Sequence, residues 1–218
     1  MNRLNGLIAV LSLLALPGCI QVSSWQTART VGEHNGEILV AFGALGISDP
    51  LGEDADAGVG TMELMGRYGV SETVDIGLKI SSFSSYVFDA KFQVVGDRTT
   101  SFGLALGPGI GITAFVGSNG IFQGHLPVHM SVHPSERFAF YFTPRYSSQF
   151  TFGDGALHYL GGSLGLEFGR KVKFGLDVSF AELLNDTDAD DVFEDFGLRL
   201  FQVGFGAKFR IQGQSNND

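Results

Sequence analysis

Alternation of apolar and polar residues runs through most of this sequence, and it limits the possible folds more than any other feature. From Asn35 onward, apolar residues recur at every second position, in segments of about ten to fourteen residues separated by turn-like clusters. A period of two places successive side chains on opposite faces of a strand. Helical periodicity is weak throughout, so we predict an all-β chain.

Ten segments show this pattern, which predicts an antiparallel up-and-down barrel of about ten strands. The expected strands are 36 to 47, 58 to 69, 73 to 84, 86 to 95, 101 to 116, 121 to 132, 138 to 151, 156 to 169, 172 to 183 and 197 to 211. The register shifts by one residue near Leu200 and Phe201, which predicts a β-bulge there.

The two faces of the expected strands differ sharply in polarity. One face is almost uniformly apolar, as in Val74, Ile76, Leu78 and Ile80. The other combines small residues with charges of both signs, and these charges form a candidate polar network: Glu63, Arg67, Asp75, Lys79, Asp89, Lys91, Arg145, Glu167, Lys173 and Asp177. Buried charges are costly unless they are paired. The network therefore suggests either a salt-bridged, filled interior or a narrow hydrophilic pore.

Alternation alone does not say which face points inward. A soluble lipocalin-like barrel would bury the apolar face, whereas a membrane barrel would turn it toward lipid. Glycines gather on the polar face, as in SFGLALGPGIGITAF (Ser101 to Phe115), and small residues suit a crowded interior. The segments match the 9 to 11 residues that a tilted transmembrane strand needs, and only 17% of the residues are charged. These observations favour a transmembrane β-barrel.

The first residues have the parts of a secretory signal peptide. One positive charge at Arg3 precedes the apolar run LIAVLSLLALPG, which is too short to span a bilayer as a helix. The four residues from Leu16 to Cys19 resemble the lipobox of bacterial lipoproteins, in which the cysteine becomes the first residue and carries lipid. In that family Ile20, rather than Asp, after the cysteine implies sorting to the outer membrane of a Gram-negative cell.

The end of the chain, GFGAKFRI, resembles the terminal insertion signal of bacterial outer-membrane barrels at Gly206, Phe209 and Ile211. The tail QGQSNND departs from that family, in which the strand usually ends the chain. This resemblance implies outer-membrane lipid and lipopolysaccharide as partners, together with the barrel-assembly and lipoprotein-sorting machinery. The net charge of −9 argues against nucleic acid, and the sequence does not determine an oligomeric state.

Connection lengths predict the orientation, because outer-membrane barrels place short turns in the periplasm and long loops outside. Short turns occur near residues 69 to 72, 96 to 100, 133 to 137 and 169 to 173, whereas the two longest connections, 48 to 57 and 182 to 195, hold eleven carboxylates. The expected organisation is a signal peptide over 1–18, a periplasmic tether over 19–34 with lipid on Cys19, a barrel over 35–211 and a tail over 212–218. Both termini are then periplasmic.

Few residues suggest specific chemistry. Asp186, Asp188 and Asp190 are spaced like Ca²⁺ ligands, but an EF-hand glycine and glutamate are missing, so a solvated acidic loop is favoured. His125, His129 and His133 share one strand face, where neighbours about 13 Å apart cannot bind one ion; hydrogen-bonded interior histidines are expected instead. No cofactor motif or enzyme signature is present.

Three functions remain open at this point. The first is an outer-membrane β-barrel lipoprotein with a structural, adhesive or narrow-pore role, and without enzymatic activity. The second is a lipid-anchored, lipocalin-like periplasmic barrel that binds an apolar ligand. The third is a hydrolase at the barrel rim, because Asp154 and His158 resemble the Asp and His pairs of omptins, a family of ten-stranded outer-membrane proteases.

Overall fold

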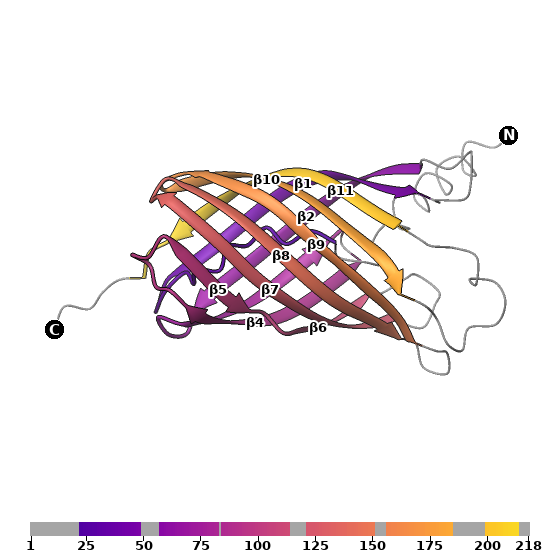
Figure 1. Ribbon diagram of the computed structural model, residues 1–218, viewed down its shortest axis with the longest axis horizontal. Coiled ribbons are helices and arrows are strands. Elements are labelled where there is room, and N and C mark those ends of the chain that lie inside the picture. Colours follow the sequence, from indigo (N-terminus) through magenta and orange to yellow (C-terminus); the bar gives the residue numbers. More distant parts are fainter. Residues whose placement is uncertain are drawn as a thin grey trace, which may run out of the picture.

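Antiparallel strands close into a barrel in the computed structural model of the chain (Figure 1). The structure describes residues 22–48, 57–82, 84–113, 121–150, 156–184 and 199–213. Its strands are β1 (Gly36–Ser48), β2 (Ala57–Gly69), β3 (Val74–Ser81), β4 (Ser85–Val95), β5 (Phe102–Leu106), β6 (Gly109–Thr113), β7 (Ile121–Ser135), β8 (Phe138–Phe150), β9 (Ala156–Gly169), β10 (Val172–Leu184) and β11 (Arg199–Ile211). No helix in the described part of the chain is long and apolar enough to cross a membrane.

Pairing between the first and last strands closes the sheet. Strand β1 pairs with β11 along its whole length, from Gly36 opposite Ile211 to Ser48 opposite Arg199, and its other edge pairs with β2. The remaining strands pair antiparallel with their neighbours in sequence. The predicted fold class, an all-β up-and-down barrel of ten strands, is confirmed.

The fifth strand differs from the prediction because it is interrupted. Strands β5 and β6 both pair with β4 and with β7, but Gly107 and Pro108 separate them. Proline has no N–H group to give to a neighbouring strand. The backbone N–H of Gly107 donates instead to the carbonyl of Pro127 at 3.0 Å, and the carbonyl of Pro108 accepts from Ala90 at 3.0 Å. The barrel therefore stays closed across the break.

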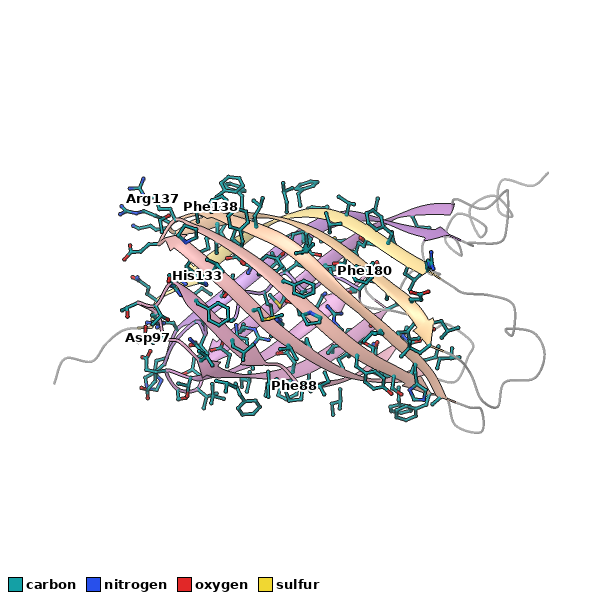
Figure 2. The ribbon with its side chains drawn as sticks, in the orientation of Figure 1. Phe88, Asp97, His133, Arg137, Phe138 and Phe180 are labelled. Carbon is teal, nitrogen blue, oxygen red and sulfur yellow. The ribbon has the colours of Figure 1, made fainter. Side chains whose placement is uncertain are left out.

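The apolar face of the strands points outward. Phe88 and Phe180 are each 51% exposed, and Figure 2 shows Phe88 at the outer edge of the barrel. Glu182 and Arg199 form an exposed ion pair, with 3.2 Å between its closest atoms, where β10 ends and β11 begins. A barrel in water would bury its apolar face. A soluble lipocalin-like barrel with an apolar ligand in its interior does not fit this arrangement.

The predicted bulge near Leu200 is wrong. Strand β11 keeps one continuous register with both β1 and β10, and Leu200 points inward while Phe201 points outward. Leu200 is an apolar residue on the inner face because it packs against Val22, Leu45 and Ala181. The apparent change of register thus marks an apolar contact inside the barrel.

Residues Val22 to Val31, named here the lumen segment, lie inside the barrel. Nine of the ten are buried, among them Trp25 and Ala28 at 1% and 0% exposure. Figure 1 shows the segment as an indigo trace within the strands. The sequence predicted a periplasmic tether over 19–34, and residues 22–31 of that range differ from the expectation because they lie inside the barrel. The physical reason is that lumen side chains supply the polar partners that this extended backbone needs.

Candidate functional site

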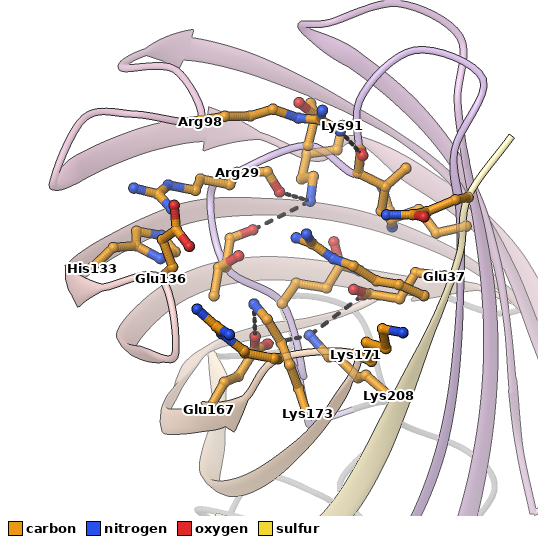
Figure 3. A pocket seen from close by; sticks show the side chains of 18 residues that line it. Arg29, Glu37, Lys91, Arg98, His133, Glu136, Glu167, Lys171, Lys173 and Lys208 are labelled. Atoms are coloured by element: carbon orange, nitrogen blue, oxygen red, sulfur yellow. Dashed lines mark hydrogen bonds and ion pairs between the residues drawn. The ribbon is translucent and has the colours of Figure 1, made fainter. Parts of the chain in front are cut away.

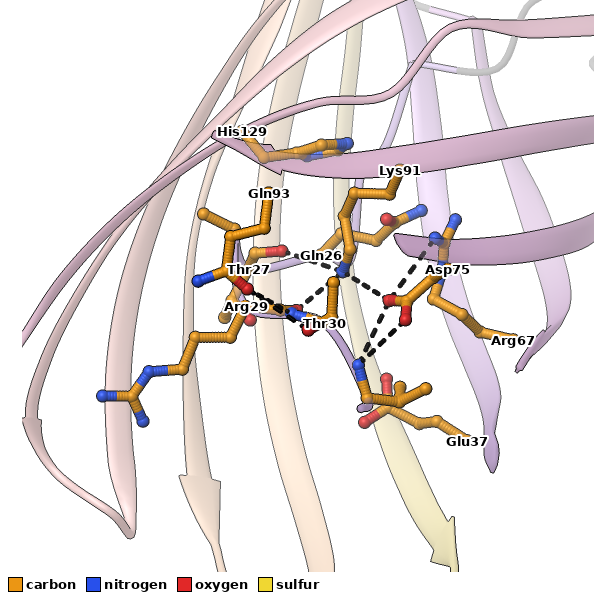
Figure 4. Close-up of polar contacts among 12 residues, drawn as sticks. Gln26, Thr27, Arg29, Thr30, Glu37, Arg67, Asp75, Lys91, Gln93 and His129 are labelled. Atoms are coloured by element: carbon orange, nitrogen blue, oxygen red, sulfur yellow. Dashed lines mark hydrogen bonds and ion pairs between the residues drawn. The ribbon is translucent and has the colours of Figure 1, made fainter. Parts of the chain in front are cut away.

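The lumen segment belongs to no sheet, so its backbone depends on side chains of the barrel for hydrogen bonds. Its N–H groups donate to inward-facing oxygens of the strands. Trp25 N–H donates to Asp177 Oδ2 at 3.2 Å, and Val31 N–H donates to Asp75 at 3.1 Å. Between them, the N–H groups of Ala28 and Thr30 each donate to a lumen side chain at 3.0 Å. Figure 4 shows the contacts of Asp75 and Thr30.

Lumen cations bind the carbonyl groups of the same segment. The Nζ of Lys79 donates to the carbonyl of Ser23 at 2.8 Å, and Arg145 Nη2 donates to that oxygen at 2.9 Å. Lys91 Nζ donates to the carbonyl of Arg29 at 2.7 Å. Carbonyls held by charged donors and N–H groups held by carboxylates are the stronger kind of hydrogen bond. The lumen charges therefore hold an extended peptide in place.

Apolar contacts anchor the segment at two points. Trp25 packs with Leu39, Ala41 and Met65 on the inner face of β1 and β2. Its ring also lies against Gly204, where a Cβ atom would be only 2.8 Å from Trp25 Cζ2. At the other point, Val22 joins the cluster that contains Leu200. A small residue at position 204 is thus what leaves room for the indole ring.

The lumen segment leaves little free volume in the middle of the barrel. The cavities that flank Val22 and Ser23 have volumes of about 10 and 40 Å³. A cavity needs roughly 10 to 15 Å³ to hold one water molecule. These spaces hold a few waters at most, so the protein itself fills the barrel around Val22 and Ser23.

A much larger cavity, about 600 Å³, lies at the mouth formed by the short turns. It is named here the basic mouth, because nine of the 14 Lys and Arg residues of the chain line it beside three carboxylates. The nine are Arg29, Arg67, Lys91, Arg98, Arg170, Lys171, Lys173, Lys208 and Arg210. Figure 3 shows Arg98 and Lys91 on one side of the space and Lys171, Lys173 and Lys208 on the other.

Ion pairs neutralise part of the basic mouth. Glu167 binds Lys173 at 3.2 Å and also pairs with Lys208. Lys208 lies 3.6 Å from Glu37, on the neighbouring strand β1. Arg67 also pairs with Asp75 and Asp89, Lys91 with Asp75, and Arg98 with Glu72. Among the described residues, no carboxylate lies within ion-pair distance of the other four cations, which are Arg29, Arg170, Lys171 and Arg210. The mouth therefore keeps an excess of positive charge.

The turn between β4 and β5 borders this mouth. Asp97 accepts hydrogen bonds there from Thr99 Oγ1 at 2.7 Å and from the N–H groups of Thr99 and Thr100 at 2.6 and 2.9 Å. These bonds favour the charged carboxylate and lower the pKa of Asp97. Arg29 of the lumen segment donates to the carbonyl of Thr100, so the turn and the segment are directly linked.

All ten charges of the network that the sequence singled out lie on the inner face of the barrel. Six of them contact the lumen segment: Glu63, Asp75, Lys79, Lys91, Arg145 and Asp177. The other four pair with each other, Arg67 with Asp89 and Glu167 with Lys173. Sequence reasoning identified these charges and missed their largest partner, the backbone of the lumen segment.

The three histidines of β7 point into the barrel and are hydrogen-bonded. His125 lies 2.9 Å from Ser147 Oγ, His129 lies 3.2 Å from Thr143 Oγ1, and His133 lies 2.9 Å from Ser131 Oγ. Among the described residues, no group of three or more His, Cys, Asp or Glu side chains is arranged to hold a metal ion.

Several predicted site residues lie outside the described part of the chain. These are Cys19, the candidate calcium ligands Asp186, Asp188 and Asp190, and Asp154. His158 is described, and its ring stacks on Tyr146 of β8, whose hydroxyl lies 2.7 Å from His158 Nδ1. Because Tyr159 beside it points inward and is buried, His158 belongs to the outward face. The structure therefore shows Tyr146 as the partner of His158, on the outer face of the barrel.

Comparison with known proteins returned matches among solved structures alone. No family model matches the chain, and no curated protein sequence does. The attachment invasion locus protein Ail of Yersinia pestis is 12% identical, with 82% of this chain and 99% of that chain covered and a TM-score of 0.35. The outer-membrane protease OmpT of Escherichia coli is 10% identical, with coverage of 81% and 96% and a TM-score of 0.40. The NanC porin is 10% identical, with coverage of 79% and 100% and a TM-score of 0.44.

Proposed function

We propose that this chain is an outer-membrane β-barrel that is closed by its own lumen segment and has a structural or adhesive role. The observation that carries this proposal is the combination of an apolar outer face with a filled, polar lumen. Leu176, Val178 and Phe180 on β10 are 40 to 51% exposed, whereas Asp177 and Ser179 between them are at most 1% exposed. Lipid satisfies such an outer face, and the closed sheet leaves no unpaired strand edge in the bilayer.

The filled lumen favours a closed barrel over the narrow-pore alternative. A ten-stranded barrel has a wider interior than an eight-stranded barrel, whose interior side chains alone can fill. In this chain glycines line part of that surface, and the lumen segment occupies the room they leave, as Trp25 does beside Gly204. The partners of such a protein are outer-membrane lipid and lipopolysaccharide, together with the assembly machinery of its class.

Labelling from the lipid phase tests the membrane orientation. We would replace Cys19 with Ser and introduce one cysteine at a time, at outward Leu176 or at inward Ser179, in the full chain refolded into phospholipid vesicles. A maleimide probe confined to the hydrocarbon phase should label the Leu176→Cys protein and spare the Ser179→Cys protein. Equal labelling of both, or recovery of the wild-type protein from a soluble periplasmic fraction, contradicts the proposal.

Lipid on Cys19 is part of this proposal, and the position of Val22 restricts where the lipid would lie. Val22 packs against Leu45, nine residues along β1 from Gly36 at the short-turn mouth. This is about 30 Å along the strand at 3.3 Å per residue. Three residue-to-residue steps of at most ~3.6 Å each lead from Val22 to Cys19, a reach of about 11 Å. We therefore place the acylated cysteine toward the long-connection mouth, instead of in the periplasmic leaflet that the sequence predicted.

An epitope tag tests this part separately. The tag would be inserted between Cys19 and Val22 in cells that express the full chain, and acylation would be followed with an azide-labelled fatty acid. We expect the label to be lost in Cys19→Ser, and the tag to be detected on intact cells. Detection only after the outer membrane is permeabilised would contradict the proposed position of the lipid, and an unlabelled wild-type protein would remove the lipid altogether.

A further inference from the structure

The basic mouth is opposite in charge to the protein around it. The chain has a net charge of −9, yet the cavity at the short-turn end is lined by nine Lys and Arg residues and three carboxylates. Like charges held close together repel one another, and they lower the stability of the fold unless an opposite charge is present. Four of the nine cations have no carboxylate partner among the described residues, so their clustering has a cost in stability that a structural role does not explain.

Buried hydrogen-bond donors without acceptors also line this mouth, beside one unpartnered acceptor, Gln26 Oε1. Arg29 Nε and Arg67 Nε are buried and have no hydrogen-bond partner among the described atoms. Arg170, Lys171 and Arg210, closer to the rim, have no carboxylate partner in the described part of the chain. Donors without acceptors are what a site for an anion provides before the anion binds.

The shape of the cavity limits how a ligand could use it. Gln26, Thr27 and Thr30 of the lumen segment line the cavity from inside the barrel, so the cavity ends there. A ligand must enter and leave through the same mouth. The volume of about 600 Å³ lies within the range of small-molecule sites.

We propose that the basic mouth binds a soluble multivalent anion, one that carries several phosphate or carboxylate groups. A soluble ligand is favoured over the headgroup of a membrane lipid because Arg29, whose buried Nε has no partner among the described atoms, belongs to the lumen segment, with the strands between it and the outer surface. The inference rests on the proposed filled barrel, since the lumen segment forms the floor of the site. In the orientation expected of outer-membrane barrels, the short turns face the periplasm, and the ligand would come from there.

Calorimetric titration of the refolded full chain with tripolyphosphate tests this inference. We expect saturable binding in phosphatidylcholine nanodiscs at low salt, weakening as salt is added because exposed charges are screened. Maltotriose, which is neutral, should not bind. Failure of tripolyphosphate to bind at low salt would overturn the proposal.

Substitutions at the rim test whether the named charges are responsible. Each exposed charge contributes roughly a 1.5- to fivefold factor, so the combined variant Arg170→Gln, Lys171→Gln and Arg210→Gln should bind tripolyphosphate about tenfold more weakly. The matched control is Arg199→Gln, which removes one exposed cation at the opposite end of the barrel and should leave binding unchanged. Equal affinities of the wild type and the combined variant, or an equal loss in the control, would refute the site.

Two further readouts keep the outcomes distinct. The fluorescence of Trp25 should be the same in all three proteins, which shows that the lumen segment has stayed in place. Native mass spectrometry in nanodiscs with phosphatidylglycerol tests whether the basic mouth binds a lipid headgroup instead. Retention of that lipid, without any binding of tripolyphosphate, would assign the charges to headgroups and overturn the proposal. A barrel that is closed to ions but binds no anion would leave the proposed function intact while removing this inference.

Discussion

Replacing Glu63 with Gln should destabilise the barrel strongly, because Glu63 is the counter-ion of a buried lysine. Its carboxylate lies 3.0 Å from Lys79 Nζ, and both side chains are at most 5% exposed. Two unit charges at this distance attract by about 5 to 6 kcal/mol at an effective dielectric constant of 20. Removing one partner of a buried pair typically costs about 3 to 5 kcal/mol. We expect a loss near 3 kcal/mol, because Gln can keep the hydrogen bonds to Ser23 and Gln202.

Urea unfolding in phospholipid vesicles provides the assay. Trp25, the only tryptophan of the chain, reports on the lumen segment that Glu63 contacts. The double variant Glu63→Gln with Lys79→Met removes both charges, and its free energy of unfolding should exceed the value expected from adding the two single losses by at least ~1.5 kcal/mol.

The matched control for the single variant is Glu182→Gln, at an exposed ion pair. Glu182 and Arg199 are 52% and 59% exposed in their side chains, so this loss should stay below about 1 kcal/mol. A Glu63→Gln loss as small as that of the control, or strictly additive losses in the double variant, would refute the reasoning.

Two further changes probe the space around the lumen segment and the turn that borders it. Gly204→Val should displace the indole of Trp25 and shift its emission to longer wavelength, since a Cβ at position 204 would be 2.8 Å from the ring; Gly60→Val, where nothing lies within 4 Å, should leave the emission unchanged. An unchanged spectrum for both would contradict the packing. Because the pKa of Asp97 is lowered in the fold, its contribution is present above the unfolded value of about 3.9 and is lost as the pH falls below it. Amide exchange of Thr100, after correction for the intrinsic rate, should therefore accelerate below about pH 4, and Asp97→Ala should abolish that dependence; identical profiles would count against it.

The alternation predicted most of the barrel because one physical rule governs every strand. Outward apolar and inward polar side chains alternate over most of each strand, so the pattern predicts both the strands and their register. Apart from the interrupted fifth strand, each expected strand agrees with the structure to within three residues at either end. The glycines of the polar face likewise indicated a crowded interior.

Local chemistry accounts for the differences within the strands. Pro108 was visible in the sequence, and its missing N–H group is the reason that the fifth strand breaks. Leu200 suggested a bulge because an apolar residue on the polar face has no explanation in the strand pattern alone. Its partner Val22 is 178 positions earlier in the chain and lies in no strand.

The lumen segment itself could not be predicted from periodicity. Val22 to Val31 follows neither a period of two nor a helical period, since an extended peptide surrounded by the barrel meets partners on all sides. One signal was present in the composition. The inner face of the expected strands carries many glycines, which leave space inside the barrel. The single tryptophan of the chain precedes the first strand. A bulky residue beside a glycine-rich lumen is a candidate for its filling.

Planar-bilayer conductance tests the central claim most directly, because a filled lumen and an open pore differ there by the passage of ions. We predict that the refolded full chain gives no steady conductance, whereas deletion of Val22 to Val31 opens a stable ion-conducting pore. Heat-modifiable migration on gels would show that the deleted protein still forms a barrel. Steady conductance of the wild-type protein, equal to that of the deletion variant, would contradict the account.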